Sequence, residues 1–309
     1  MDEISVGSVI TSWANGPITD SAPGGTVYAS GEKTNNKYIG TSVNDTPMAS
    51  ILEGAESAGK ATGIIATSEI THATPAAFSS HAESRQDYNS IMKQQLYKNM
   101  EVVLGGGSEF FESTGGGKRN DGKDLTENIK ALGYDYVTNK SEMEKSNSDK
   151  LWGLFAKRDL AYDFDRRSLN NEEEPSLAEM TEKAIRVLEK EDKGFFLMVE
   201  GSKIDWAAHA NNTVGIVSDI LAFDEAVNAA VEFAKADGNT VVVVTTDRGN
   251  SGITIGSNYY NENIDKYTTK PGAKAKHVLF ETEEEAKASK DKIDSGETTF
   301  EELYSQYEA

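Results

Sequence analysis

Residues 195–209 read Phe-Phe-Leu-Met-Val-Glu-Gly-Ser-Lys-Ile-Asp-Trp-Ala-Ala-His, an apolar run followed at once by polar side chains. The first five residues have the length and composition of a buried strand, and Glu200, Asp205 and His209 follow its C-terminal end. Open α/β sheets build their sites at the C-terminal ends of strands. This stretch therefore predicts both a sheet and a site at its edge.

A second apolar run, Thr240–Val244, is predicted to be another buried strand, and Asp247 follows it in the same way. A mixture of carboxylates and imidazole suits zinc, whereas carboxylates with hydroxyl oxygens suit magnesium. The two runs together predict a metal site. Arg248 stands where a further ligand is expected, and a guanidinium cannot ligate a metal because it has no acceptor atom.

Helical patterns alternate with short apolar runs along the rest of the chain. Further strands are predicted at 4–12, 61–67, 102–104 and 134–138, and helices at 26–31, 46–58, 88–99, 125–132, 177–189 and 216–235. Residues 139–174 are expected to form an acidic polar connection. The alternation predicts a doubly wound α/β fold with a mainly parallel sheet flanked by helices.

Composition narrows the function classes. The 309 residues carry a formal net charge of −20, which argues against nucleic acid as a partner because phosphate backbones attract clustered Lys and Arg. Cysteine is absent, so neither disulfides nor thiolate metal sites are available. No apolar run is long enough to span a membrane, and the first residues do not resemble a secretory signal.

Asp20 and Ser21 precede a predicted helix. Either residue could cap that helix, which is the commoner role for such residues. A helix N-terminus also attracts anions, and a serine there becomes a nucleophile if a base or a metal lowers its pKa. Ser21 therefore has both a structural and a catalytic interpretation.

The segment Thr71–Ala77 follows the predicted strand 61–67. We expect Pro75 to keep the preceding chain extended, so that His72 and Thr74 point to the same side. Arg85 could offer a bidentate fork to a phosphate, or it could form an ordinary surface ion pair.

Asp205 and His209 lie four residues apart. On a helix this spacing places both side chains on one face, where they could hold a single ion or simply face solvent. Their position at a strand end favours the metal interpretation.

Four segments together resemble the alkaline phosphatase family. They are Asp20-Ser21-Ala22, Thr71–Ala77 with Ser84-Arg85, Val199–His209 and Thr245-Thr246-Asp247, and the resemblance runs from about residue 2 to about residue 265. It implies that Ser21 is the nucleophile of a phosphoserine intermediate. Asp20 would position Arg85, and Arg85 would clamp the phosphate oxygens. His72 and Trp206 would support the site near magnesium and the substrate.

The same resemblance implies a metal arrangement. Asp205 and His209 would hold one zinc ion, and Asp247 would hold a second beside the nucleophile. Thr74 and Glu200 would belong to a magnesium site. The family also implies a small phosphomonoester substrate, a homodimer, and a secreted or periplasmic location.

Three parts of the family pattern are missing from the sequence. An opening strand that ends in Asp-Gly is absent, Arg248 replaces a zinc-binding histidine, and a late His-Thr-Gly segment is not found. Of the four histidines, His277 is the candidate left for that last ligand, and its context does not match. Incomplete metal ligation and impaired turnover are therefore expected.

The chain is predicted to divide into residues 1–267, resembling alkaline phosphatase, and residues 268–309. The second part resembles the opening strand and helix of a parvulin-type prolyl isomerase, with His277 on the strand; a charged amphipathic helix is the alternative. The sequence thus favours a metal-dependent phosphomonoester hydrolase. A catalytically impaired binding protein on the same scaffold and a prolyl-isomerase-like folding helper are the alternatives.

Overall fold

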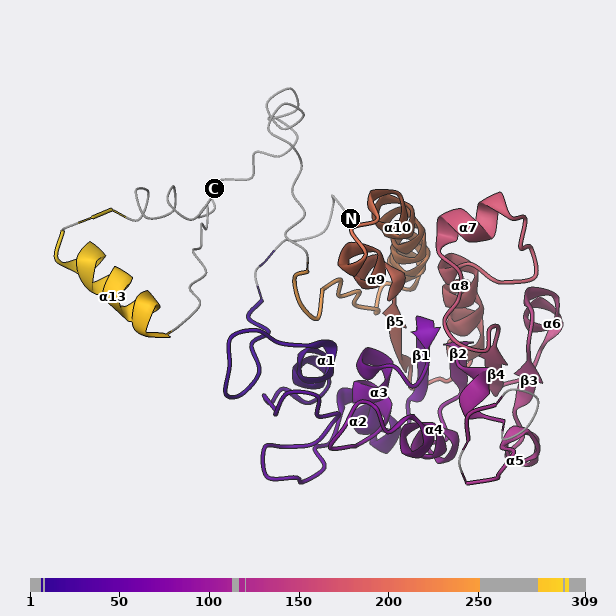
Figure 1. Cartoon of the computed structure of the whole chain (residues 1–309). Coiled ribbons are helices and arrows are strands. Elements are labelled where there is room, and N and C mark those ends of the chain that lie inside the picture. The colour runs from indigo at the N-terminus through magenta and orange to yellow at the C-terminus, as the bar shows by residue number, and fades with distance from the viewer. Residues whose placement is uncertain are drawn as a thin grey trace. The chain divides into compact units, whose positions relative to one another are not determined.

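A parallel sheet of five strands organises the larger of two units in the computed structural model (Figure 1). The units are Met1–Ile253 and Thr254–Ala309. The structure describes residues 7, 9–112, 117–119, 121–250, 283–296 and 298–299. Within these residues, no helix is both long and apolar enough to cross a membrane.

The strand order of the sheet is β3-β4-β2-β1-β5, and every pair of neighbours is parallel. The strands are β1 (Ala61–Glu69), β2 (Val102–Gly106), β3 (Asp135–Val137), β4 (Leu151–Leu154) and β5 (Phe195–Glu200). The predicted α/β class is confirmed.

Helices cover both faces of the sheet, which divides the core into two clusters (Figure 1). Because alternate strand residues point to opposite faces, Ile64 packs in one cluster and Ile65 in the other. Trp152 of β4 lies in the first cluster beside Phe111, and Leu188 of α8 (Leu177–Leu188) lies in the second. Strands buried on both faces are the expected form of a parallel sheet.

Several helices begin at well-formed caps. Asp20 accepts the first cap hydrogen bond of α1, and Ser50 and Ser176 form capping boxes with Glu53 and Glu179. The helices of the larger unit are α1 (Ser21–Ser30), α2 (Ile51–Ser57), α3 (Ala73–Ser79), α4 (Tyr88–Tyr97), α5 (Thr126–Ala131), α6 (Lys140–Lys145), α7 (Asp163–Ser168), α8 (Leu177–Leu188), α9 (Lys203–His209) and α10 (Thr213–Asp237), with a 3-10 turn η1 at Ser108–Phe110.

The connection predicted for residues 139–174 contains structure that the sequence did not indicate. It holds α6, α7 and the strand β4, which pairs with both β2 and β3. Four residues are too few to show a periodicity, so β4 is recognisable only through its neighbours.

The prediction of a buried strand at Thr240–Val244 was wrong. This run belongs to no strand, and Val241 and Val243 are 85% and 77% exposed. Among the described strands, β5 is the edge of the sheet, so the apolar run lacks the hydrogen-bonded ladder that defines a strand. Apolar composition alone cannot supply that partner.

The predictions for the two ends of the chain can be compared with the structure only in part. Residues 1–6 and 8 lie outside the described residues, and residues 9–12 form no strand. In the second unit, the predicted strand around His277 also lies outside the described residues, whereas α13 (Glu283–Asp294) forms a helix. The parvulin-like interpretation of this segment stays a prediction.

Glu53 joins α2 to α4 and to the loop after α3. Its carboxylate accepts hydrogen bonds from the Ser50 backbone N–H at 2.9 Å, from His81 at 3.0 Å and from Lys98. Although burial alone would raise the pKa of Glu53, these partners lower it to about 2. The ionised form of Glu53 therefore stabilises the fold.

We predict that Glu53→Gln lowers the free energy of unfolding by about 2 kcal/mol at pH 7, because each unit of pKa shift corresponds to about 1.4 kcal/mol and the side chain is partly exposed. A lowered carboxyl pKa gives stability that is complete above the unfolded value of 4.5 and is lost as pH falls toward 2. The deficit of the variant should therefore shrink in acid. Urea titrations at pH 7 and pH 3 measure it.

The exposed Glu182, which lies 3.8 Å from Arg186 on α8, provides a matched control. Its change to Gln should alter stability by less than about 0.5 kcal/mol. Equal losses for the two variants would contradict the role given to Glu53.

Candidate active site

The C-terminal ends of β1 and β5 lie side by side where the strand order of the sheet reverses. From β1 the chain forms β2, β3 and β4 on one side, and β5 then pairs with the other side of β1. Such a reversal of strand order is a topological switch point, where open α/β sheets bind ligands. At this point the chain leaves β1 and β5 in different directions, and polar side chains lie between the two strand ends.

Ser202 connects the two strand ends. Its hydroxyl donates to Glu200 at 2.6 Å and lies 3.0 Å from the Ser68 hydroxyl, while the Ser68 N–H donates to Ser202 at 3.2 Å. Ser68 and Ser202 are both buried. The end of β5, which carries Glu200, is thus fixed against the end of β1.

Glu200 is a carboxyl group in an environment that disfavours its charge. Burial raises its pKa to about 7, and the nearby Asp247 adds to the effect, whereas the Ser202 hydrogen bond opposes it. The Thr74 hydroxyl is close enough to lower the pKa slightly, but its oxygen is buried without a well-formed hydrogen bond to any described residue. A buried hydroxyl oxygen and a poorly solvated carboxylate together match the oxygen ligands of a hard cation.

Ser21 is the first residue of α1 and is only 4% exposed. Asp20, its predecessor, caps the helix by accepting from the Ala22 N–H at 2.8 Å, so of the two predicted caps the structure selects Asp20. The Ser21 side chain is left free to interact with Asp247 and lowers its pKa, although burial, the larger effect, raises it.

Gly24 permits this approach of Asp247 to α1. A Cβ atom at residue 24 would lie 2.6 Å from the Asp247 carbonyl oxygen, so any larger residue would push the two segments apart. The segment is also fixed by Tyr28, whose hydroxyl lies 2.6 Å from the Thr245 hydroxyl and donates to the Thr246 carbonyl at 3.0 Å.

Arg85 lies between Asp20 and His72. One guanidinium nitrogen is 3.6 Å from the Asp20 carboxylate, and another donates to His72 Nε2 at 2.9 Å. Burial, together with the charges of Arg85 and Arg248, lowers the pKa of His72 to about 3, so the ring is neutral and accepts at Nε2. The Trp206 ring packs edge-on against the His72 ring, with the two ring centroids 5.4 Å apart.

The expectation that residues before Pro75 stay extended was wrong. His72 is the N-cap of α3, and Thr74 and Pro75 lie in its first turn. Proline is tolerated there because the first N–H groups of a helix have no intrahelical partner. His72 and Thr74 therefore lie at the N-terminus of a short helix, next to the end of β1.

Asp205 and His209 lie on α9, as their spacing predicted, with His209 Nε2 3.6 Å from the Asp205 carboxylate. Arg248 contacts both. Its Nη2 atom donates to Asp205 Oδ2 at 3.3 Å and to His209 Nε2 at 3.1 Å. Asn250 donates to Asp205 Oδ1 at 2.8 Å and to the Asp205 carbonyl at 3.1 Å.

The two predicted metal positions differ in how well the residues fit a metal. Thr74 presents a hydroxyl oxygen without a hydrogen-bond partner among the described residues, and Glu200 presents a buried carboxyl group with a hydrogen bond from Ser202 to one oxygen, an oxygen set that suits magnesium. Asp205 and His209 instead turn their acceptor atoms toward a guanidinium, so the pair in this arrangement does not fit zinc. Within the described part of the chain, no group of three or more His, Asp or Glu side chains could hold a metal ion.

Sequence reasoning missed Ser202 and Lys203. Lys203 is 3% exposed, forms an ion pair with Asp159, and places its ammonium 4.4 Å from the Tyr162 ring and 4.7 Å from the Trp206 ring. The hydroxyl two residues after the strand-end carboxylate was a possible signal for Ser202. Nothing in the sequence marks Lys203, because surface lysines are common and its partners are distant in the chain.

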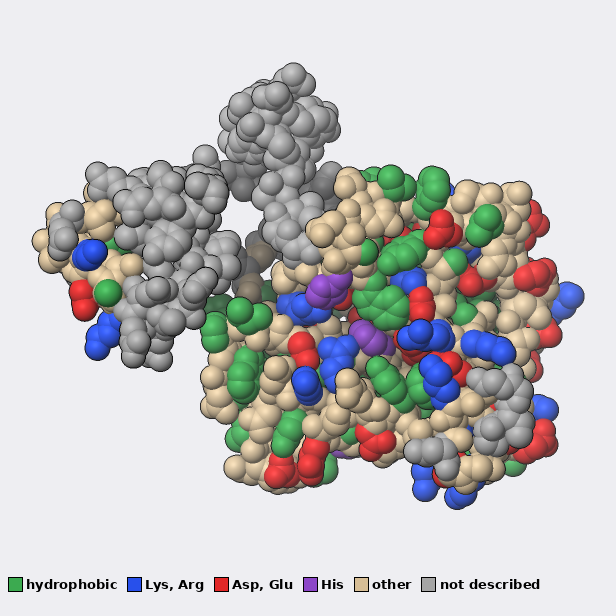
Figure 2. Space-filling view, viewed as in Figure 1, with side chains coloured by type: hydrophobic (Ala, Val, Ile, Leu, Met, Phe, Trp, Pro, Cys, Tyr) green, Lys and Arg blue, Asp and Glu red, His purple; other side chains and the backbone are tan. Residues whose placement is uncertain are grey.

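Polar side chains gather on the face that contains this site. Figure 2 shows histidine, basic and acidic side chains close together near the middle of the larger unit, with apolar side chains between them. The mixture of signs is consistent with the ion pairs around Asp20, Arg85, Asp205 and Arg248.

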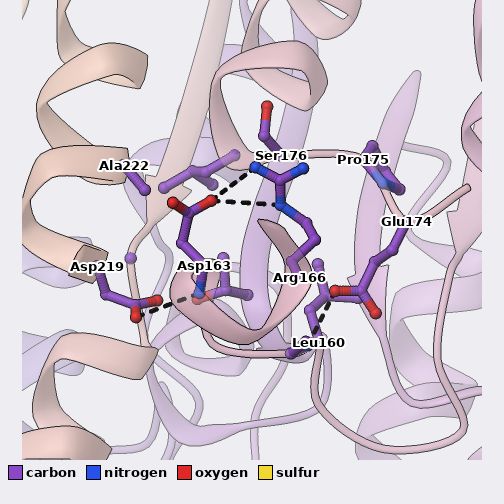
Figure 3. A pocket seen from close by; sticks show the side chains of 12 residues that line it. Leu160, Asp163, Arg166, Glu174, Pro175, Ser176, Asp219 and Ala222 are labelled. Atoms are coloured by element: carbon purple, nitrogen blue, oxygen red, sulfur yellow. Dashed lines mark hydrogen bonds and ion pairs between the residues drawn. The ribbon is translucent and has the colours of Figure 1, made fainter. Parts of the chain in front are cut away.

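A small cavity lies beside this site and does not include its residues (Figure 3). Arg166 donates to Asp163 at 2.7 Å, the Asp163 N–H donates to Asp219 at 3.3 Å, and Glu174 accepts from the Ala161 N–H at 2.9 Å. Burial raises the pKa of Glu174 and raises that of Asp219 to about 6, with the Asp163 charge adding to the effect on Asp219. This cavity lies between α7, α8 and α10, and three buried carboxyl groups line it beside apolar side chains.

Comparison with known proteins identifies a family. Residues 1–308 match the family model described as alkaline phosphatase. The chain is 47% identical over 247 residues to alkaline phosphatase 4 of Bacillus subtilis strain 168, covering 78% of this chain and 51% of that protein. It is 35% identical to the alkaline phosphatase of Escherichia coli K12, covering 76% and 58%.

Solved structures agree with the fold. Alkaline phosphatase from Thermus thermophilus superposes with a TM-score of 0.71 at 35% identity, covering 74% of this chain and 48% of that one. A histidine-to-glutamate mutant of alkaline phosphatase from the Antarctic bacterium TAB5, with Mg bound in its M3 site, gives a TM-score of 0.71 at 35% identity, covering 79% and 68%. The chain spans about half the length of the curated relatives it matches.

We predict that Asp219→Asn changes stability in a pH-dependent way. A raised carboxyl pKa means that the folded state disfavours the charge, so the wild type loses stability as pH rises from about 4 to above 6. The variant has no such charge. Between pH 4 and pH 8, the free energy of unfolding of the variant should increase by about 2 kcal/mol relative to that of the wild type.

Denaturant titrations of both proteins across this range provide the measurement. A difference that stays constant with pH would show that Asp219 is not held in a disfavoured charged state.

Proposed function

Since this chain belongs to the alkaline phosphatase family, we propose that it carries the nucleophile and the phosphate clamp of a phosphomonoester hydrolase. The nucleophile is Ser21 and the clamp is Arg85. The observation that carries the proposal is the position of Ser21, buried at the N-terminus of α1 with Asp247 against its side chain and the Asp20–Arg85 pair beside it.

Each group has a physical reason for its role. The N–H groups and dipole at the start of α1 favour an anion, and a guanidinium fork matches two phosphate oxygens. Asp20 and His72 hold Arg85 on two sides, which reduces the entropy lost when it binds phosphate. Trp206 supports His72 in turn, since the indole packs against the imidazole.

The reaction then has two displacements. The Ser21 hydroxyl attacks phosphorus while Asp247 accepts its proton, the phosphoserine bond forms, and the ester bond breaks to release an alcohol that takes up that proton. The raised pKa of Asp247 makes it a better base than an exposed aspartate. Water next attacks the phosphoserine, inorganic phosphate leaves, and the serine hydroxyl is restored.

Magnesium is the cation that the residues fit. Thr74 and Glu200 would hold it, and when bound it would supply positive charge next to the phosphate site. The family resemblance assigns zinc to Asp205 with His209, and a second zinc to Asp247. We derive no step through zinc, because Arg248 engages the first pair.

A phosphate-binding protein without turnover is the second candidate function. It is favoured by one observation, the fixed guanidinium of Arg248 where a metal would otherwise activate the reaction. The fold and the clamp would then bind a phosphomonoester without cleaving it.

The family also suggests the setting of the protein. We propose a small phosphomonoester as the substrate, a location in the periplasm or outside the cell, and a homodimer as the assembly. The net charge of −20 supports the exclusion of nucleic acid from this proposal, since a polyanion would be repelled.

We predict that Ser21→Ala abolishes hydrolysis of p-nitrophenyl phosphate in the presence of magnesium. The loss in kcat/KM should be at least about a hundredfold, because the variant has no oxygen to form the covalent intermediate. Release of p-nitrophenol measures the rate, and circular dichroism checks the fold.

Ser30→Ala is the matched control, since Ser30 lies on the same helix and its hydroxyl bonds the Thr26 carbonyl. It should keep full activity. Turnover that is unchanged in Ser21→Ala would sink the proposed mechanism. Absent turnover in the wild type, with phosphate binding retained by calorimetry, would establish the second candidate.

Arg85→Lys tests the clamp separately. Lysine keeps the charge but has no planar fork, so we predict at least a tenfold increase in the Kd for inorganic phosphate. Titration calorimetry measures the Kd, and an affinity equal to that of the wild type would exclude Arg85 from the phosphate site.

A further inference from the structure

We infer that the guanidinium of Arg248 serves as the built-in cation of the Asp205–His209 pair and excludes zinc from it. The inference deepens the proposed function, on which it rests, by stating what regulates metal occupancy of that site. It follows from a disagreement between the family's metal arrangement and the contacts of this chain.

The contacts occupy the atoms that zinc would need. Arg248 Nη2 is 3.2 Å from Asp205 Oδ1, 3.3 Å from Oδ2 and 3.1 Å from His209 Nε2. A guanidinium can only donate, so His209 Nε2 must accept in this contact. The same lone pair would be required for a zinc–imidazole bond.

The neighbours of Asp205 leave it little freedom to turn toward another ion. Asn250 donates to Asp205 Oδ1 at 2.8 Å, so both carboxylate oxygens have donors. The Arg248 and Asp205 side chains are 16% and 27% exposed, which limits screening by water.

Arg248 itself is held in place by its segment. Thr245 and Thr246 contact the Tyr28 hydroxyl, and the Asp247 backbone lies against Gly24 of α1. The arginine is therefore presented to α9 by a chain that α1 fixes. It does not have to be recruited from a mobile surface, so its contact with the pair costs little side-chain and backbone entropy.

A divalent ion would have to displace this charge or bind beside it. Two unit charges about 4 Å apart repel by on the order of 4 kcal/mol in a partly buried site, and zinc carries twice the charge. The two ligands that the described residues offer do not offset such repulsion, since zinc sites ordinarily have three or four. Removing the guanidinium should therefore expose a latent zinc site.

The experiment measures zinc binding and needs no enzyme activity. Protein stripped with a chelator is titrated with zinc chloride in competition with a chromophoric chelator, using the wild type, Arg248→Ala, His209→Ala and the double variant. Arg186→Ala is the matched control, because Arg186 forms only an exposed ion pair with Glu182.

We expect wild type, His209→Ala and Arg186→Ala to give the same zinc isotherm. Arg248→Ala should bind zinc with a Kd at least tenfold lower than that of the wild type, and the double variant should bind zinc no more tightly than the wild type. The comparison of wild type with His209→Ala does not depend on the folding of any Arg248 variant, so it stands if Arg248→Ala is unstable.

Two outcomes would overturn the inference. One is a wild-type zinc site that His209→Ala removes. The other is a folded Arg248→Ala that gains no zinc affinity dependent on His209. Neither outcome bears on Ser21, so a failure of this inference is distinct from a failure of the hydrolase proposal, which the phosphatase assay decides.

Discussion

The parallel pairing of β1 with β5 is the constraint on which the site depends. Their register sets Ala66 opposite Glu200, and the Ser68–Ser202 contacts fix the two strand ends together. After β1 the chain continues to β2 on one side of β1, whereas β5 pairs with the other side of β1. The helix α3 follows β1 and α9 follows β5, so both helices begin at this place in the sheet.

Charged side chains lie close together in the partly buried site at these strand ends, and they form ion pairs between segments that are distant in sequence. Arg85 lies against Asp20, and Arg248 lies against Asp205. Glu200 has no comparable cation among its described contacts, and its pKa rises to about 7 as a result of burial. This asymmetry explains why the Thr74–Glu200 side suits a cation and why the Asp205–His209 side does not. The two halves of one site thus differ in what they can bind.

Prediction from the sequence succeeded where the information is local. The Asp20 cap and the i,i+4 placement of Asp205 and His209 each depend on residues within one helical turn. It failed where a partner is distant. β4 is defined by β2 and β3, the run at Thr240–Val244 lacks a ladder, and the start of α3 at His72 overrode the extended conformation expected before Pro75.

The sequence by itself determined the α/β class and the family, and it proposed most of the polar residues of the candidate site, because periodicity, caps and motif spacing are written along the chain. It also showed that Arg248 was out of place, but not what that arginine does. Only the tertiary structure decided that Arg248 reaches Asp205 and His209, 43 and 39 residues away, and that Ser202 fixes Glu200. Such contacts arise from packing three segments around one sheet edge, and no local pattern encodes them.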